Sequence, residues 1–375
     1  MILTTCPACA APLAHTAPRC VRCSTRYCNK TCQHDHWRRG HKQICKKIHR
    51  GGNAELYYAN KKYKEAVAVA AEACADDTKG QTCFICTQAL HWKTKEGLVR
   101  GCACRGTAGF SHVSCLAEQA KILFAEAEEN NLGDNAFDER WDRWFSCSLC
   151  EQEYHGVTRC ALGWACWKTY VGRPEGDWAR GAAMMALGNG LYNAKHYEDA
   201  FAVKEAELAM LRRLGDSEEN ILIVQGNLAC TYGELKRLDE ALSLRRDVYS
   251  RRLKLNGEEH SSTIRAANNY ASSLLGQKRF EEAKALFRRT IPVARRVLGD
   301  HNDLTLLMRR LYAVALCNDP GATLDDLREA IETFEETGRI ARRVLGSAHP
   351  LTKKIENALR QSRAALRACE TPSAG

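Results

Sequence analysis

The sequence has no apolar run long enough to cross a membrane as a helix. Its best candidate, residues 160–167, is bounded closely by Arg159 and Lys168. The first five residues also lack the basic start and apolar core of a secretory signal peptide, and they lead directly into Cys6. These absences argue against a membrane protein and a secreted, disulfide-bonded one. They predict an intracellular chain, cytoplasmic or nuclear, whose thiols are reduced.

Cysteine, in contrast, is abundant, with 20 in 375 residues. Between residues 83 and 150, seven cysteines and one histidine form four close pairs. In order, these pairs are Cys83 and Cys86, Cys102 and Cys104, His112 and Cys115, and Cys147 and Cys150. Zinc prefers four nitrogen or sulfur ligands in a tetrahedron, and a Cys-x2-Cys turn places two sulfurs on one ion with little strain. Eight ligands therefore predict two zinc ions, although any single pair taken alone could be a buried structural pair.

The first fifty residues contain a second set of eight such ligands. They are Cys6, Cys9, Cys20, Cys23, Cys28, Cys32, His41 and Cys45. A segment this small buries little apolar surface, so bound metal is expected to supply its folding free energy. The predicted cofactors are therefore four zinc ions per chain.

The formal charge of +10 overstates how basic the metal-bound protein would be. Fourteen thiolates would add fourteen negative charges and four zinc ions eight positive ones, which leaves about +4. Basic residues cluster between positions 19 and 50, but aromatic side chains do not alternate with them as a stacking platform. A solvated basic face is therefore favoured, and nucleic acid is not an expected partner.

The ligand order between residues 83 and 150 resembles that of the RING-CH (RINGv, C4HC3) finger, with Cys-x-Cys as the second pair and seven residues between Cys104 and His112. The resemblance implies a cross-brace, with Cys83, Cys86, His112 and Cys115 on one zinc and Cys102, Cys104, Cys147 and Cys150 on the other. It also implies an E3 ubiquitin-protein ligase, which recruits a charged ubiquitin-conjugating enzyme without a covalent intermediate, so no residue is assigned a catalytic role. The implied contacts with that enzyme are Ile85, Trp144 and Leu149, and local core is the alternative for Trp144.

Two departures from the family pattern keep a second function open. Gln119 stands where the family often has a tryptophan, and the spacing from Cys115 to Cys147 is long. The alternative to a ligase is a non-catalytic, zinc-dependent scaffold for protein interactions.

Residues 27–45 resemble the MYND finger in their Tyr-Cys, Cys-Gln, His-Trp and His-Lys-x2-Cys elements. The resemblance implies interleaved sites, with Cys6, Cys9, Cys28 and Cys32 on one zinc and Cys20, Cys23, His41 and Cys45 on the other. One extra residue separates Cys32 from His41, and a turn at Gly40 is expected to absorb it. The family binds short peptides, which implies contacts at Gln33 and Trp37; the alternative for Trp37 is packing between the two metal sites. A methyltransferase of the SET–MYND kind is not expected, because no strand-rich segment with a cofactor motif remains.

Beyond residue 177 the sequence repeats with a period near 42 residues. Segments 195–200, 236–241 and 278–283 are related, and each ends in an alanine where two helices must approach closely. The pattern resembles the long tetratricopeptide repeats of kinesin light chains and predicts about four helix pairs and a closing helix near residues 351–366. Such pairs stack into a superhelix with a concave face. By resemblance the first helix of each pair lines that groove, where Asn227 and Asn269 would bind an extended peptide, unless they only shape the turn between helices.

The predicted fold is mainly α, with two small cross-brace zinc modules followed by an α-solenoid of tetratricopeptide helix pairs. The predicted domains are a MYND finger at 1–50, a helical connector at 51–82, a RING-CH finger with its flank at 83–176, and the repeat array at 177–370. Residues 54–74 are expected to form a helix from an alanine-rich run of good helix formers, and residues 60–66 within it resemble the turn of a helical hairpin repeat. Residues 173–176 are interpreted as a linker. The predicted partners are a ubiquitin-conjugating enzyme and protein or peptide ligands of the repeats and the MYND finger, with no membrane contact. If the chain is a ligase, the repeats or the MYND finger are expected to select its substrate.

Overall fold

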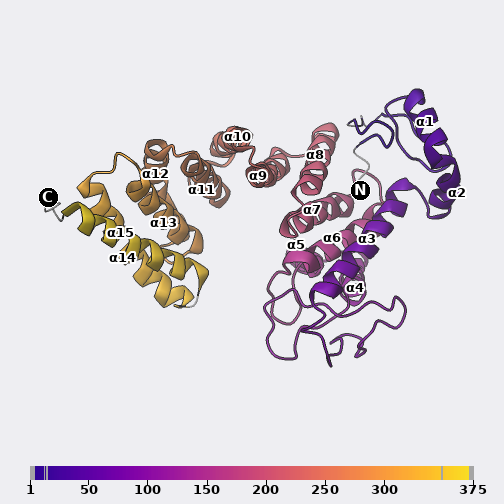
Figure 1. The fold of residues 1–375 in the computed structure, drawn as a ribbon, viewed down its shortest axis with the longest axis horizontal. Coiled ribbons are helices and arrows are strands. Elements are labelled where there is room, and N and C mark those ends of the chain that lie inside the picture. The colour runs from indigo at the N-terminus through magenta and orange to yellow at the C-terminus, as the bar shows by residue number, and fades with distance from the viewer. Residues whose placement is uncertain (1–4, 12, 14–15, 348, 371–375) are drawn as a thin grey trace. The chain divides into compact units, whose positions relative to one another are not determined.

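The computed structural model of the protein describes residues 5–347 and 349–370, except 12, 14 and 15. The described chain is mainly helical (Figure 1), and its extended segments pair only at three isolated bridges. These bridges join Arg19 to Arg26, Val99 to Ser111, and Ser146 to Glu153. The chain divides into two compact units, residues 1–227 and 228–375, and each is described by itself. The predicted fold class, mainly α with two small cysteine-rich modules ahead of helical repeats, is confirmed.

The first cysteine-rich module consists of loops and three short helical segments. They are α1 (Lys30–His36), the π-helical turn η1 (Trp37–His41) and α2 (Lys42–Arg50). Asn29 starts α1 because its side chain accepts a hydrogen bond of 2.9 Å from the Cys32 N–H. Gly40 bends the chain inside η1 at a φ of 123°, which glycine adopts without a Cβ clash. The turn expected between Cys32 and His41 therefore lies at Gly40.

This first module packs directly onto α3 (Ala54–Ala73). Tyr27, Ile48 and Ala54 are fully buried and share one core with the module's cysteines. The Ala54 N–H also donates a hydrogen bond of 2.9 Å to the Cys23 carbonyl. The first module and α3 are thus one packed structure.

Helix α3 confirms the helix expected over residues 54–74, and it runs unbroken through residues 60–66, so the hairpin turn that those residues resemble does not form. The buried positions of α3 follow helical spacing from its first residue to its last turn. They are Ala54, Ala59, Tyr63, Val67 and Ala70. One continuous buried face favours a single helix over the turn that the local sequence resembles.

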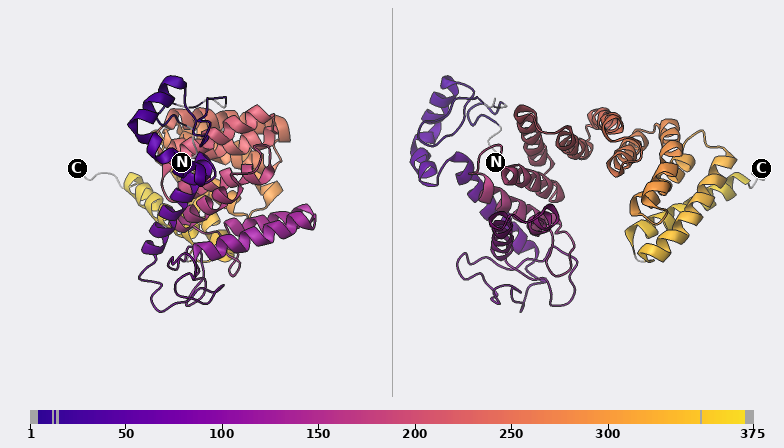
Figure 2. Two further views of the ribbon diagram at one scale, coloured as in Figure 1. Left: turned by 90° about the vertical axis from the view of Figure 1, so that its right-hand side faces the viewer. Right: turned by 180° about the vertical axis from the view of Figure 1, so that it is seen from behind.

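The partner of α3 is α6 (Gly156–Tyr170), which comes more than eighty residues later in the chain. The ammonium of Lys168 lies 3.7 Å from the centre of the Tyr63 ring, and Val69 and Val157 line one small cavity. These contacts make α3 and α6 an antiparallel pair (Figures 1 and 2). Residues 74–155 form the connection between the two helices and contain the second set of predicted zinc ligands.

Three helical segments lie within this connection. They are α4 (Val113–Glu129), α5 (Asp134–Trp141) and the short 3-10 helix η2 (Asp142–Trp144). The Phe124 ring of α4 anchors them, because its centre lies 5.0 Å from that of Phe137, 4.8 Å from that of Trp141 and 5.7 Å from that of Tyr170. This aromatic cluster fixes the connection against α6.

Helix α6 also packs closely against α7 (Trp178–Asn193). A Cβ on Gly163 would lie 3.0 Å from the Ala186 carbonyl oxygen, and one on Gly190 would lie 2.8 Å from the Arg159 carbonyl oxygen. Glycine therefore allows the two backbones to approach at both positions.

Residues 173–176, predicted as a linker, lie in the short connection between α6 and α7. Arg173 donates two hydrogen bonds of 2.6 Å to the Glu128 carboxylate on α4. Bidentate pairs of this kind hold both partners in one geometry. The domain boundary predicted at residue 176 stays a prediction.

The remaining helices form the repeats in the predicted order, with four pairs and a closing helix. They are α7 with α8 (Tyr197–Leu214), α9 (Glu218–Glu234) with α10 (Leu238–Asn256), α11 (Ser261–Gly276) with α12 (Phe280–Leu298), α13 (Asp303–Asn318) with α14 (Leu324–Leu345), and α15 (Pro350–Glu370). Within the second unit, each helix from α10 to α15 packs against the next. No helix in the described part of the chain has the length and apolar character needed to cross a membrane.

The first three repeats share one turn geometry between the helices of a pair. Lys195, Lys236 and Lys278 stand at equivalent positions and have left-handed φ angles of 63°, 62° and 60°. The alanines that the sequence placed at close helix contacts are all buried. They are Ala200, Ala241, Ala283 and Ala330. The repeat of the sequence thus corresponds to a repeat of the same turn and the same buried alanine position in the structure.

Candidate metal centres and partner surfaces

The structure brings together four groups of four side chains, with the same members that the sequence predicts. In each group, the four sulfur or imidazole nitrogen atoms lie within 4.8 Å of one another. The groups are Cys6, Cys9, Cys28 and Cys32; Cys20, Cys23, His41 and Cys45; Cys83, Cys86, His112 and Cys115; and Cys102, Cys104, Cys147 and Cys150. Each group joins ligands that are distant in sequence, as a cross-brace requires.

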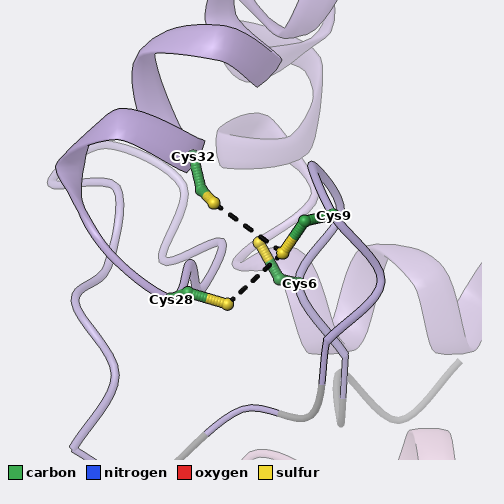
Figure 3. Close-up of side chains that lie close together, drawn as sticks. All are labelled: Cys6, Cys9, Cys28 and Cys32. Carbon is green, nitrogen blue, oxygen red and sulfur yellow. Dashed lines mark hydrogen bonds between the residues drawn. The ribbon is translucent and has the colours of Figure 1, made fainter.

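The sulfur–sulfur distances match a shared metal ion. In the first group (Figure 3), Cys9 Sγ lies 3.5 Å from Cys28 Sγ and 3.7 Å from Cys32 Sγ. Two thiolates on one tetrahedral zinc, each at about 2.3 Å, would be about 3.8 Å apart. A disulfide would require about 2.05 Å. The donor set and its spacing therefore fit zinc.

The two histidines present different nitrogens to their groups. His41 Nε2 lies 3.3 Å from Cys23 Sγ, whereas His112 Nδ1 lies 3.4 Å from Cys86 Sγ and 3.6 Å from Cys115 Sγ. The other nitrogen of His112, Nε2, lies 3.4 Å from the Ala89 carbonyl oxygen. A second contact of this kind orients a metal-binding imidazole and fixes its tautomer. The protein thus pre-positions Nδ1 of His112 as a donor.

The thiols of one group cannot all ionise easily without a cation. Burial and hydrogen bonds with Cys20 and Cys23 raise the pKa of Cys45 to about 12. A bound zinc ion would lower the pKa of these thiols, because it binds the thiolate and releases the proton. The residues present therefore suit a divalent metal with an affinity for sulfur.

A repeated backbone turn positions these ligands. In each Cys-x2-Cys segment the N–H of the first cysteine donates to the carbonyl five residues later, and the fifth residue of the turn has a left-handed φ. The four turns start at Cys6, Cys20, Cys83 and Cys147. Sequence reasoning identified these turns from their cysteines alone.

A fifth turn of the same geometry starts at His91 and was missed. The His91 N–H donates to the Glu96 carbonyl at 3.0 Å, and Lys95 has the left-handed φ. Thr94 replaces the second cysteine, and its hydroxyl lies 2.8 Å from His91 Nδ1. The turn closes on a hydrogen bond, so no Cys-x2-Cys signal marks it. Trp92, at its tip, is 68% exposed.

Two of the predicted conjugating-enzyme contacts lie on the surface and one does not. Ile85 is 37% exposed and Leu149 is 52% exposed, and both occupy the third position of their turns. The N–H of each donates to the first cysteine Sγ at 3.4 Å. Trp144, in contrast, is 1% exposed and packs against Trp141 and Tyr170. Trp144 is therefore local core, the alternative given for it, and not an exposed partner contact, because η2 turns it into the aromatic cluster.

The predicted peptide-binding residues of the first module are partly accessible. Trp37 is exposed, and its ring lies edge-on to His41 with 5.9 Å between ring centres. Gln33 is half-buried on α1. The His36 ring stacks on His41 at 4.8 Å, and His36 Nδ1 lies 3.0 Å from the Tyr27 hydroxyl. The Trp37 ring thus packs against the predicted zinc ligand His41 and is also exposed to solvent. Peptide binding at Trp37 stays a prediction.

The predicted peptide-binding asparagines of the repeats lie on α9 and α11, the first helices of their pairs, and both are half-buried. The Asn227 carbonyl accepts a hydrogen bond of 3.3 Å from Lys204 Nζ, and the Asn269 carbonyl accepts one of 3.2 Å from Arg245 Nη1. In both cases a basic side chain of the preceding helix donates to a main-chain carbonyl, and these two bonds do not involve the asparagine side chains. Their contact with a peptide stays a prediction.

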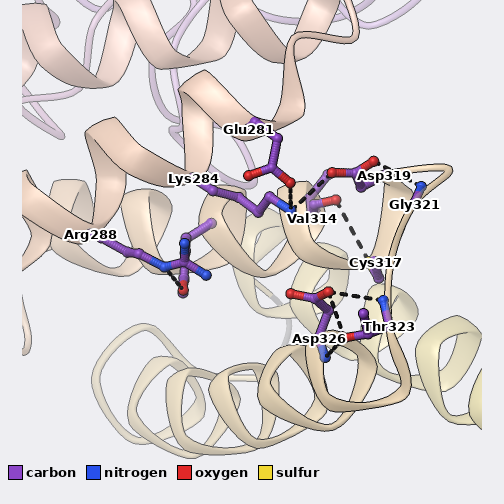
Figure 4. A network of polar contacts seen from close by, with 10 residues as sticks. Glu281, Lys284, Arg288, Val314, Cys317, Asp319, Gly321, Thr323 and Asp326 are labelled. Atoms are coloured by element: carbon purple, nitrogen blue, oxygen red, sulfur yellow. Dashed lines mark hydrogen bonds and ion pairs between the residues drawn. The ribbon is translucent and has the colours of Figure 1, made fainter.

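A buried lysine fixes the connection between α13 and α14 (Figure 4). Lys284 is buried and donates hydrogen bonds to Glu281 and, at 2.9 Å, to Asp319. Asp319 in turn accepts a hydrogen bond of 3.0 Å from the Gly321 N–H. The next helix starts with a capping box between Thr323 and Asp326. These bonds hold the one irregular connection of the second unit in place.

Comparison with known proteins supports two of the three predicted modules. Residues 6–45 match the model of the MYND finger. Residues 222–262 and 263–303 each match a model of the tetratricopeptide repeat. The chain therefore contains a segment that matches the MYND finger and two that match the tetratricopeptide repeat. No curated protein matches the chain.

Solved structures of repeat proteins are similar to parts of the chain at low identity. TPR-like repeats of a Podosopora anserina protein described as a kinesin light chain are 19% identical, with a TM-score of 0.43, over 51% of this chain and 88% of that one. BtubC (BKLC) from P. vanneervenii is 12% identical, with a TM-score of 0.38, over 70% of this chain and 93% of that one. Neither similarity is close enough to inform function.

Proposed function

We propose that the protein is a zinc-dependent scaffold for protein interactions. The observation that carries this proposal is the set of four donor groups at zinc-like distances in a chain with a MYND finger and tetratricopeptide repeats. In this proposal four zinc ions stabilise the two cysteine-rich modules, and the repeats and the MYND finger bind peptides. Asn227 and Asn269 in the repeats, with Gln33 and Trp37 in the finger, are the proposed contacts.

Selection of peptides from a random displayed library on the zinc-loaded chain tests this function. We expect enriched sequences whose affinity falls about tenfold or more in the double variant Asn227→Ala, Asn269→Ala, because each lost hydrogen bond costs roughly 1 kcal/mol. The matched control is Asn193→Ala, an exposed asparagine at the end of α7. Peptides that bind the double variant and the parent chain equally would exclude these asparagines as the site.

A second candidate function, an E3 ubiquitin-protein ligase, is favoured by one specific observation. Ile85 and Leu149 are exposed at equivalent tips of two turns within residues 83–150. In the RING-CH interpretation these tips hold a charged conjugating enzyme, and the protein supplies positioning without a covalent intermediate. Trp92, exposed on the fifth turn, would add apolar surface to the same module.

An autoubiquitination assay against a panel of conjugating enzymes separates the two functions. If the protein is a ligase, Ile85→Ala should reduce ubiquitin transfer at least tenfold while zinc content is unchanged, because an anchor in a protein interface typically contributes more than 1 kcal/mol. Val21→Ala is the matched control, since Val21 is an exposed apolar residue on the Cys20-x2-Cys23 turn of the first module. Absence of ubiquitin chains with every enzyme, from protein shown to contain zinc, would leave the scaffold as the function.

A further inference from the structure

The first unit contains a cavity of about 410 Å³ that none of the predicted metal ligands line. One face of α7 contributes Trp178, Met185 and Asn189 to it, and α8 contributes Glu207 and Met210. The loop after η2 and the start of α6 also line it, through Phe145, Glu153 and Arg159. Its volume is within the range of sites that bind a small ligand or one long side chain.

Glu207 is the unusual residue of this cavity. It is only 3% exposed, yet it lines the cavity. Neither a hydrogen bond nor an ion pair to its carboxyl group is found in the described part of the chain. Lys204, one turn earlier on α8, has its ammonium 4.7 Å from the centre of the Tyr192 ring and 3.3 Å from the Asn227 carbonyl oxygen. A buried carboxylate without a partner is costly, and such groups concentrate at functional sites.

The other charges in the lining are already paired. Arg159 is the one basic residue among those that line the cavity. It donates a hydrogen bond of 2.7 Å to the Phe145 carbonyl and lies 3.7 Å from the Glu153 carboxylate. The remaining acidic residues pair elsewhere, in the contacts Glu175 with Arg213, Asp177 with Arg173, and Asp216 with Asn220. Among the residues that line the cavity, none therefore pairs a positive charge with Glu207.

The walls suit the aliphatic stem of a long cationic side chain. Met185, Met210 and Leu214 are apolar, and Trp178 is 51% exposed. The Trp178 ring lies 4.9 Å, edge to face, from Trp141. Lysine and arginine pack their methylene groups on such surfaces, and their charged heads are attracted to tryptophan rings.

We propose that this cavity binds the side chain of a lysine or arginine in a peptide segment of a protein partner, with the cationic head at Glu207 and the stem between Trp178 and Met185. The proposal adds a partner chemistry to the scaffold and does not depend on zinc stoichiometry or ubiquitin transfer. Burial raises the pKa of Glu207 to about 8, and Lys204 opposes only part of that effect. A bound cation would therefore displace a proton near neutral pH.

The test uses the zinc-loaded full-length chain and three probes: lysine, arginine and norleucine, each capped by an acetyl and a methylamide group. Norleucine keeps the aliphatic stem and lacks the charge. Ligand-observed NMR should show that the lysine or arginine probe binds at least tenfold more tightly than the norleucine probe. Equal binding of norleucine, or no binding of either cationic probe, would overturn the proposal.

Two variants then locate the site. Glu207→Gln removes the charge, and Gly181→Leu fills the cavity, where a Cβ at Gly181 would meet only Met210, at 3.8 Å. Both should weaken binding of the cationic probe at least tenfold, with an unchanged helical circular dichroism spectrum. Glu198→Gln, which removes an exposed charge from the same helix, should leave binding unchanged. Unaltered binding in both Glu207→Gln and Gly181→Leu would show that the probe binds elsewhere.

Discussion

Removal of zinc by a chelator is expected to unfold both cysteine-rich modules and leave the helices of residues 228–370 intact. The buried core of the first module is largely cysteine, with only Tyr27, Ile48 and Ala54 as further fully buried members. The core around Cys83 adds only Leu98 and Phe110. Structural zinc contributes roughly 10–16 kcal/mol to small zinc-binding domains. That exceeds the roughly 5–15 kcal/mol by which a whole domain is usually stable, so the modules should not survive its loss.

Native mass spectrometry and hydrogen exchange check this expectation. The untreated chain should carry four zinc ions, and chelation should remove amide protection from residues 5–50 and 83–155 first. Cys23→Ser should lower zinc occupancy, whereas Cys74→Ser should retain four ions, because Cys74 lies outside every donor group. Two zinc ions in the untreated chain, or full protection after chelation, would contradict the proposed sites.

Glu207→Gln is expected to stabilise the protein at alkaline pH, although it removes a charged residue. The pKa of Glu207 is raised by burial to about 8 in the folded protein, from an ordinary value of 4.5. Between these two values the folded state keeps a proton that the unfolded state has lost, so the free energy of unfolding falls as pH rises. The fall amounts to about 1.4 kcal/mol per pH unit, with an upper bound of about 5 kcal/mol by pH 8. Glutamine is neutral at every pH, and its substitution should remove this slope.

Chemical denaturation of both proteins from pH 5 to pH 9 measures the effect. The difference in unfolding free energy should grow in favour of Glu207→Gln across this window and level off above pH 8. Other charged groups line the same cavity or share the helix with Glu207. They are Glu153, Arg159, Glu175, Asp177, Lys204 and Asp216. Because they remain in both proteins, their titration cancels to first order, and a parallel pH dependence would show that Glu207 is ionised in the folded state.

The ligand groups could be predicted from the sequence because their signal is local. A Cys-x2-Cys segment fixes its own turn, and the order of the pairs decides which turns share a metal. The repeats were predictable for a similar reason, since a period in residue type becomes a period in helices. The fifth turn, at His91, was not predictable, because Thr94 carries no ligand signal and the turn closes on its own hydrogen bond.

The errors all concern burial by distant parts of the chain. Residues 60–66 resemble a hairpin turn, but the partner that makes α3 one helix is α6, far along the sequence. The RING-CH resemblance implied that Trp144 contacts a partner, yet Tyr170 and Trp141 pack against it and bury it. No prediction concerned Glu207, because three residues after Lys204 it has the local pattern of a solvated ion pair. Only the packing of α7 and the loop after η2 makes it the buried floor of a cavity.

The antiparallel pair of α3 and α6 implies that the second cysteine-rich module is an insertion between the two helices of a helical hairpin. Helices α3 and α6 pack along each other, and Val69 near the end of α3 lines the same cavity as Val157 at the start of α6. A short turn could therefore rejoin the hairpin if residues 74–155 were excised. The module is joined to the helix pair through both of its ends. It therefore cannot rotate relative to these helices as freely as a module that is joined through one end.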